Sequence, residues 1–319
     1  MSMSQIIRTL KKNKRFLIST HVNPDPDALC SQLAIARYLR SMGKKVSILN
    51  EGPVPHRLKF LKGIKNVQSF DAGQRLAYDV AILVDCGEVN RIGKVQRLIQ
   101  KDKVLINIDH HLTNNYFGTL NLVQPYASST AEVLYELFLK AKCPLTKTMA
   151  EHLYIGIMTD TGSFRHENTT AKTHAIAASL MKFNLAVPAL YQKLYETISV
   201  KDFRELLRAI KNYEVHFKRK VVCIRLKKNV MSRFSTGFDL RDTIFKFFRS
   251  IHGVEVIAVF TEIQHRKIRL NFRSSNKFNV AKLASYFHGG GHRRASGCLI
   301  ENTITTAQRM VLRKIKTLL

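Results

Sequence analysis

The 319-residue chain has few cysteines, few acidic residues and no long apolar run. The cysteines form no CxxC pair, and their odd number and wide spacing argue against a disulfide framework and a zinc–thiolate site. No segment approaches the roughly 18 uncharged apolar residues that a membrane span needs. The N-terminus also lacks an apolar signal core, so the expected location is the cytoplasm. The five cysteines are Cys30, Cys86, Cys143, Cys223 and Cys298.

Acidic residues are outnumbered by basic ones, with 23 Asp and Glu against 52 Lys and Arg, which gives a net charge of +29. Such an excess favours polyanionic partners: nucleic acid, nucleotides or acidic lipid. A basic proteome or general solubility would give the same count. Because the charge is spread over segments such as 11–15, 218–220 and 293–294, we expect a folded basic surface rather than a disordered arm.

The first half of the chain alternates strand-like and helix-like segments, which is typical of a mostly parallel α/β sheet. A capping-box pattern of Ser129 and Glu132 opens one of the helices. From about residue 213, strand pairs, a helix, a glycine loop and a final helix predict a second, smaller α/β domain. We expect strands over 16–20, 46–49, 80–84 and 104–108, and helices over 28–42, 92–100, 131–140, 147–158 and 170–183.

Four apolar segments each end on aspartate or histidine. If the first three are strands of one parallel sheet, their ends converge on one crevice, where open α/β sheets bind ligands. Asp25 and Asp27 are two residues apart and would point the same way in an extended segment, although Asp27 could instead cap the following helix. The residues delivered are His21, Asp25, Asp27, Asp85, Asp109, His110, His111 and Asp160.

Two imidazoles and four carboxylates at one place predict a metal site, because clustered carboxylates repel one another unless cations or protons lie between them. Oxygen-rich ligands with some nitrogen suit Mn²⁺ or Mg²⁺. Six ligands suit two ions about 3.5–4 Å apart that share a carboxylate. Asp85 is the expected bridge, since it follows a separate strand between the other groups. The six expected ligands are His21, Asp25, Asp27, Asp85, His110 and Asp160.

These segments resemble the four motifs of the DHH phosphoesterase family, and the segment 289–297 resembles the signature of the associated DHHA1 domain. The resemblance runs from about residue 16 to 300, in the expected order. It implies a mostly parallel-sheet DHH domain and a smaller α/β DHHA1 domain, with the active site in the cleft between them. We expect a catalytic domain over 1–187, a helical connector over 188–215 and a substrate-binding domain over 216–319.

The resemblance also implies individual roles. Asp109 would orient an imidazole, and His111 would face the phosphate as a donor or general acid. The cofactors would be two divalent ions, Mn²⁺ first, with Mg²⁺ or Co²⁺ as alternatives. One ion would be held by His21, Asp25 and Asp85, and the other by Asp27, Asp85, His110 and Asp160.

A run of three glycines lets backbone N–H groups approach a phosphate closely, and His292 and Arg293 add donors beside it. The alternative is a plain glycine-rich turn before the next strand. By resemblance, Arg273 and Ser274 form a second phosphate anchor, with an exposed loop as the alternative. The glycines are Gly289, Gly290 and Gly291.

The two-domain length resembles the subgroup that hydrolyses short oligoribonucleotides (nano-RNA) to mononucleotides and removes the 3′-phosphate of 3′-phosphoadenosine-5′-phosphate (pAp). Expected partners are therefore short RNA and nucleotide bisphosphates, with no membrane; a homodimer is left open. The alternatives are a linear or cyclic dinucleotide phosphodiesterase, a pyrophosphatase or exopolyphosphatase, and a non-catalytic RNA-binding protein. The segment 289–297 argues against the pyrophosphatase lineage, and the six intact ligands argue against a non-catalytic protein.

Overall fold

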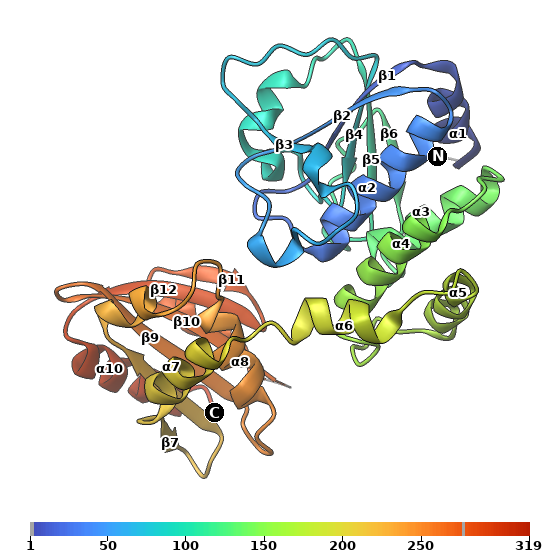
Figure 1. Ribbon diagram of the computed structural model, residues 1–319. Coiled ribbons are helices and arrows are strands. Elements are labelled where there is room, and N and C mark those ends of the chain that lie inside the picture. The colour runs from blue at the N-terminus through green and yellow to red at the C-terminus, as the bar shows by residue number, and fades with distance from the viewer. Residues whose placement is uncertain (1–2, 276–277) are drawn as a thin grey trace. The chain divides into compact units, whose positions relative to one another are not determined.

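Two six-stranded sheets, one in each half of the chain, organise the fold (Figure 1). The computed structural model describes residues 3–275 and 278–319. The chain divides into a first unit that ends at Thr197 and a second unit over Ile198–Leu319. Among the described residues, no helix has the length and apolar character to cross a membrane. The α/β class expected from the alternating segments is confirmed in both units.

The sheet of the first unit is parallel throughout, as predicted, with the strand order β3-β2-β1-β4-β5-β6. Parallel strands with both faces covered are apolar runs, and β4 is buried at every position. Every strand therefore ends at the same edge of the sheet. The strands are β1 (Arg15–Ser19), β2 (Lys45–Asn50), β3 (Val67–Ser69), β4 (Val80–Val84), β5 (Val104–Asp109) and β6 (Leu120–Val123).

Helices cover one face of this sheet, and a 3₁₀ segment covers the other. Phe16 of β1 packs into the core beneath the helices, whereas the next residue, Leu17, packs into the core that contains Ile92. This alternation follows from the strand period of two. The helices of the first unit, not all of which contact the sheet, are α1 (Met3–Lys12), α2 (Pro26–Ser41), α3 (Thr130–Lys140), α4 (Lys147–Asp160), α5 (Ala171–Met181) and α6 (Val187–Tyr195).

The helix predicted over 92–100 is wrong. The stretch is a kinked 3₁₀ segment, Val89–Leu98, with Gly93 in a left-handed conformation at φ 62°. A Cβ atom at Gly93 would overlap the Glu51 carboxylate. Glu51 accepts a hydrogen bond from the Lys94 backbone N–H at 2.5 Å, so a tertiary contact sets the kink.

The second unit holds a mixed sheet with the order β11-β12-β10-β9-β8-β7, in which only β8 and β9 pair in parallel among the described strands. Helices α9 and α10 pack on one face, and α7 and α8 pack on the other. The predicted glycine loop is partly wrong, because Gly290–His292 pairs with β12. The elements are α7 (Val200–Ile210), β7 (Glu214–His216), β8 (Val221–Leu226), α8 (Leu240–Arg249), β9 (Val256–Gln264), β10 (Lys267–Ser274), α9 (Val280–Tyr286), β11 (Gly290–His292), β12 (Ala295–Glu301) and α10 (Ile304–Lys316).

Candidate metal centre

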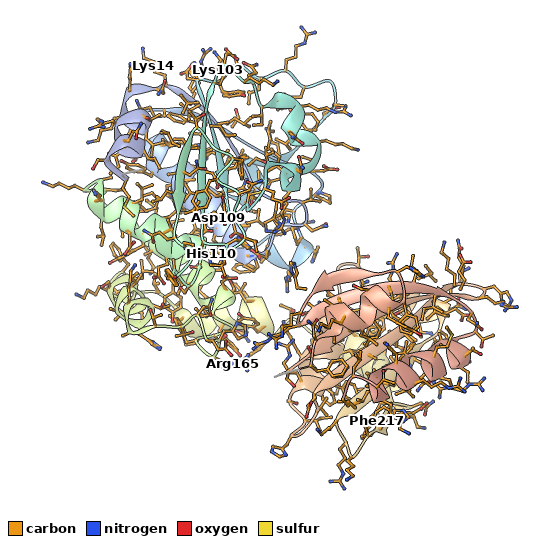
Figure 2. The ribbon with its side chains drawn as sticks, turned by 180° about the vertical axis from the view of Figure 1, so that it is seen from behind. Lys14, Lys103, Asp109, His110, Arg165 and Phe217 are labelled. Atoms are coloured by element: carbon orange, nitrogen blue, oxygen red, sulfur yellow. The ribbon has the colours of Figure 1, made fainter. Side chains whose placement is uncertain are left out.

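Polar side chains gather where β1, β4, β5 and α4 end. His21 follows β1, Asp85 follows β4, His110 follows β5, and Asp160 is the last residue of α4. Figure 2 shows Asp109 and His110 on the side of the sheet away from Lys14 and Lys103. Parallel strands bring their C-terminal ends to one edge, so residues far apart in sequence meet here.

Three groups of potential ligand atoms form at this edge, each with its atoms within 4.8 Å of one another. Asp85 belongs to two of them, which places it between the other side chains. The structure therefore brings together all six residues that the sequence proposes as ligands, and His111 with them. The groups are His21, Asp25 and Asp85; Asp27, His110 and Asp160; and Asp85, His110 and His111.

The two imidazoles are oriented in the same way. In His21 and His110 alike, Nδ1 lies next to a backbone carbonyl oxygen, at 3.0 and 3.3 Å. The Nε2 atom of His21 lies 3.5 Å from Asp85 Oδ2. The Nε2 atom of His110 lies 3.6 Å from Asp85 Oδ1 and 3.3 Å from Asp160 Oδ2. Fixing Nδ1 on a carbonyl and aiming Nε2 inward is the usual arrangement of histidines that bind metals.

Asp85 occupies the centre in a strained conformation. Its backbone lies in the left-handed region at φ 56°, which aspartate tolerates better than most residues. The side chain is buried, which by itself would raise its pKa. The hydrogen bond with His21 and the charges of His110 and His111 outweigh burial and lower the pKa of Asp85 to about 2. Its two oxygens face different histidines, as a bridging carboxylate requires.

Asp25 and Asp27 have separate local partners. Asp25 is the N-cap of α2, accepting a hydrogen bond from the Ala28 N–H at 3.0 Å, so the suggestion that Asp27 caps this helix is wrong. Asp27 instead accepts hydrogen bonds from the backbone N–H groups of Thr130 at 2.8 Å and Ala131 at 3.0 Å. These groups begin α3, where the helix dipole favours an anion. Burial still raises the pKa of Asp27 well above its usual value.

Sequence reasoning missed Thr130. Its hydroxyl donates to Asp85 Oδ1 at 2.9 Å, while its backbone N–H binds Asp27. One residue thus holds two of the clustered carboxylates. The capping pattern at Ser129 marks the helix start but gives no sign of these long-range contacts. Gly156 of α4 was also missed: a Cβ atom there would overlap Asp27 Oδ1.

The carboxylates of this cluster crowd one another. Burial, opposed by His110 and reinforced by the charge of Asp85, raises the pKa of Asp160 to about 7. Burial and the charge of Asp85 also raise the pKa of Asp25. Divalent cations would relieve this repulsion, and the donor set of carboxylate oxygens and imidazole nitrogens fits them.

Asp109 and His111 form a pair beside the cluster. Asp109 is fully buried, and its Oδ1 lies 2.7 Å from His111 Nδ1. The contact with Asp109 raises the pKa of His111 to about 9. Asn114, which sequence reasoning also missed, donates to Asp109 Oδ2 at 2.6 Å and to Asn107 Oδ1 at 2.8 Å. The aspartate is thereby held in place to orient the imidazole.

The proposed phosphate-binding glycines lie in the second unit, in the β11–β12 hairpin. A Cβ atom at Gly289 would overlap the Gly297 carbonyl oxygen, and one at Gly291 would lie 2.6 Å from the Ala295 carbonyl oxygen. Packing alone therefore requires glycine at both positions. Gly290 differs, because a Cβ atom placed there would have no other atom within 4 Å.

The other proposed substrate-binding residues also lie in the second unit. The guanidinium of Arg273 stacks 4.7 Å from the ring centre of Phe245. Ser274 is buried and donates its hydroxyl to a backbone carbonyl at 2.8 Å. His292 and Arg293 are exposed on the hairpin. Arg273 also donates to a backbone carbonyl, that of Phe272, at 3.0 Å.

Comparison with known families supports the expectations from the sequence. Residues 15–157 match the DHH family, N-terminal domain, and residues 238–318 match the DHHA1 domain. The bifunctional oligoribonuclease and PAP phosphatase NrnA of Bacillus subtilis is 30% identical and covers 93% of each chain. The protein with the same description from Thermus thermophilus is 27% identical over 89% of this chain and 83% of its own length.

Solved structures agree with this assignment. An exopolyphosphatase-related protein from Bacteroides fragilis superimposes with a TM-score of 0.90 at 26% identity, covering 99% of this chain and 96% of that one. The exonuclease RecJ, crystallised with manganese, shares the fold at a TM-score of 0.51 and 14% identity, over 98% of this chain and 93% of that one. On these matches, and on the motifs that its sequence carries, the chain belongs to the DHH family of phosphoesterases.

Proposed function

We propose that this phosphoesterase hydrolyses short oligoribonucleotides to mononucleotides and removes the 3′-phosphate of pAp. The observation that carries the proposal is the gathering of four carboxylates and two imidazoles at the C-terminal edge of the parallel sheet. Relatives that match almost the whole chain are described as oligoribonucleases and PAP phosphatases, which supports this choice of substrates. Five free cysteines agree with work in the cytoplasm.

Two divalent ions fit the candidate centre, with Mn²⁺ as the first choice. We assign His21, Asp25 and Asp85 to one ion, and Asp27, Asp85, His110 and Asp160 to the other. When bound, such ions polarise a phosphate oxygen and lower the pKa of a water molecule. Thr130 and the start of α3 hold Asp27 and Asp85 in position for this role.

His111 is the proposed donor to the substrate phosphate. Asp109 engages its Nδ1, so Nε2 is the atom that can face the substrate. The imidazole is about a third exposed, which allows contact with a ligand. It can hold a proton at Nε2 and donate it to the leaving oxygen.

The second unit supplies substrate binding in this proposal. The exposed side chains of His292 and Arg293, together with the open backbone at Gly290, offer hydrogen bonds and positive charge to a phosphate. Arg273 lies on Phe245 and donates from one guanidinium nitrogen to the Phe272 carbonyl oxygen, so its remaining N–H groups are the proposed donors to a phosphate. Gly289, Gly291 and Ser274 act through the shape of the hairpin and the adjoining strand.

The direct test is a substrate series with purified protein and Mn²⁺. Initial rates would be compared for RNAs of about 2, 5 and 24 nucleotides and for pAp, with EDTA as the control. We expect fast hydrolysis of the two short RNAs, release of phosphate from pAp and slow attack on the longest RNA. Absence of turnover on all four substrates, or equal rates at every RNA length, would overturn the proposal.

A further inference from the structure

The first unit carries a second charged surface, at the edge of the sheet where the strands begin. Two lysines end α1, and others stand at or just before the starts of β1, β2 and β5. All of them are exposed. We call this surface the basic edge, and it consists of Lys11, Lys12, Lys14, Lys45 and Lys101.

Backbone contacts bring these lysines to the same edge. The Lys45 N–H donates to the Lys14 carbonyl oxygen at 2.9 Å, at the paired starts of β1 and β2. The ammonium of Lys44 donates to the carbonyl oxygen of Lys11 at 2.6 Å, which ties the end of α1 to the same place. β4 pairs with both β1 and β5, so the segment before β5, which contains Lys101, lies at the same edge of the sheet.

The basic edge lies opposite the candidate metal centre. Figure 2 shows Lys14 and Lys103 at one end of the first unit, and Asp109 and His110 toward the other. Because β5 runs from Val104 to Asp109, the two edges are about 17 Å apart at roughly 3.3 Å per residue. A molecule bound at the basic edge would therefore leave the metal centre free.

The lysines of the basic edge have no acidic partners among residues 3–275 and 278–319. Two acids at the same edge, just before β4 and β5, have other partners: Asp79 pairs with Arg15 at 2.9 Å, and Asp102 lies 3.6 Å from Lys103. Lysines at a helix C-terminus complement the helix dipole, which accounts for the two at the end of α1. It does not account for the three that stand beside strands.

We propose that the basic edge binds the phosphate backbone of RNA that is longer than the substrate. Gathering like charges costs stability unless an anion neutralises them. A lipid surface fits less well, because membrane-binding helices present an apolar face. The apolar face of α1 is buried in its own unit through Ile6, Ile7 and Leu10. The basic edge can therefore attract a partner through charge alone, and the phosphate backbone of RNA is bound in this way without contacts to the bases.

The geometry favours a duplex. From β2 across β1 and β4 to β5 the edge spans three strand spacings, or about 14 Å, which is enough to contact several phosphates of one strand. Single strands are usually held by stacking on aromatic side chains, and the exposed aromatic residues described in the first unit, Tyr116, Tyr126 and Tyr191, lie outside the segments that carry the five lysines. Such a site would keep the enzyme near structured RNA while its other edge acts on released fragments.

The test is binding of a fluorescent RNA duplex of about 20 base pairs in EDTA, at salt concentrations between about 50 and 200 mM. The edge variant changes Lys12, Lys14, Lys45 and Lys101 to Gln. The matched control changes four exposed lysines of the second unit, Lys218, Lys227, Lys228 and Lys282, to Gln. We expect the edge variant to bind at least about tenfold more weakly, with a log–log salt slope shallower by about 3, and the control to keep most of the slope.

Unchanged binding by the edge variant, or equal losses in both variants, would overturn the proposal. Loss of binding to phosphatidylserine vesicles with RNA binding intact would assign the edge to lipid instead. Dinucleotide hydrolysis in Mn²⁺ should match the wild type in the edge variant, which confirms its folding. If the edge variant does not fold, the pair Lys12→Gln and Lys14→Gln should show about half the change in slope. If the wild type did not hydrolyse dinucleotides, the proposed function would be wrong, but the proposal of an RNA-binding site would be unaffected.

Discussion

The C-terminal edge of the first sheet and the glycine hairpin of the second unit carry equally conspicuous motifs, but packing explains them to different degrees. In the hairpin, neighbouring backbone atoms already require Gly289 and Gly291. At the sheet edge, burial and the charge of Asp85 raise the pKa values of Asp25 and Asp160, so keeping these two carboxylates ionised opposes folding. Residues that oppose stability need a functional reason, whereas residues that packing requires do not.

The largest expected effect is that of Asp85→Asn. The change removes the charge shared by two of the three ligand groups, so we expect metal-dependent hydrolysis of a dinucleotide to fall by at least about 10³-fold. Asp79→Asn, which alters an acid at the opposite edge, should leave the rate unchanged. If Asp85→Asn kept a rate within tenfold of the wild type, the claim that function rather than packing requires the carboxylates of the sheet edge would be wrong.

Substitutions in the hairpin should change the stability of the protein rather than its catalytic rate. Gly289→Ala and Gly291→Ala force a Cβ atom against backbone, so each should lower the free energy of unfolding by about 2–3 kcal/mol. Gly290→Ala, with open space around it, should change stability by less than about 0.5 kcal/mol. Urea denaturation measures all three. Equal effects at the three positions would contradict the packing account, and a raised KM for Gly290→Ala alone would support contact with the substrate.

Thr130 tests whether the sheet edge depends on its supporting contacts. Thr130→Val keeps the shape but removes the hydroxyl that donates to Asp85, and we expect Mn²⁺ affinity to fall by about tenfold or more. Thr130→Ser should restore it. Calorimetric titration of Mn²⁺ gives the affinity separately from turnover. Wild-type affinity in the Val variant would show that the hydrogen bond does not position the carboxylate.

The smallest effect concerns stability at the metal centre. The pKa of Asp160 is about 7 in the folded protein against 3.8 as its ordinary value, so the folded state binds this proton more tightly. Stability from this group is present below about pH 4 and is lost as the pH rises through 7. Asp160→Asn should therefore stabilise the metal-free protein by about 1–2 kcal/mol at pH 8, and much less at pH 5. Thermal unfolding at the two pH values checks this, and destabilisation at pH 8 would contradict it.

Much of the candidate centre could be predicted because a parallel sheet places the ends of its strands together. The meeting of His21, Asp85 and His110 follows from the apolar strand segments that precede them and from the assumption of one parallel sheet. Asp160 lies at the end of a helix, and the sequence predicted a helix over 147–158. The assignment of these residues to particular ions stays a prediction.

Contacts between distant segments could not be read from local patterns. Thr130 and Asp85 are far apart in sequence, so their hydrogen bond exists only once α3 packs against the sheet. The glycine run predicts a turn, but its pairing with β12 depends on the partner strand. Gly93 looked acceptable in a helix because its clash is with Glu51, which lies on another segment.

The most direct test of the metal centre is the number of Mn²⁺ ions bound per chain, measured by equilibrium dialysis with elemental analysis. We expect two ions in the wild type and fewer in Asp85→Asn, because the proposal assigns this carboxylate to both ions. Binding of at most one ion by the wild type, or the same stoichiometry and affinity in both proteins, would contradict the account.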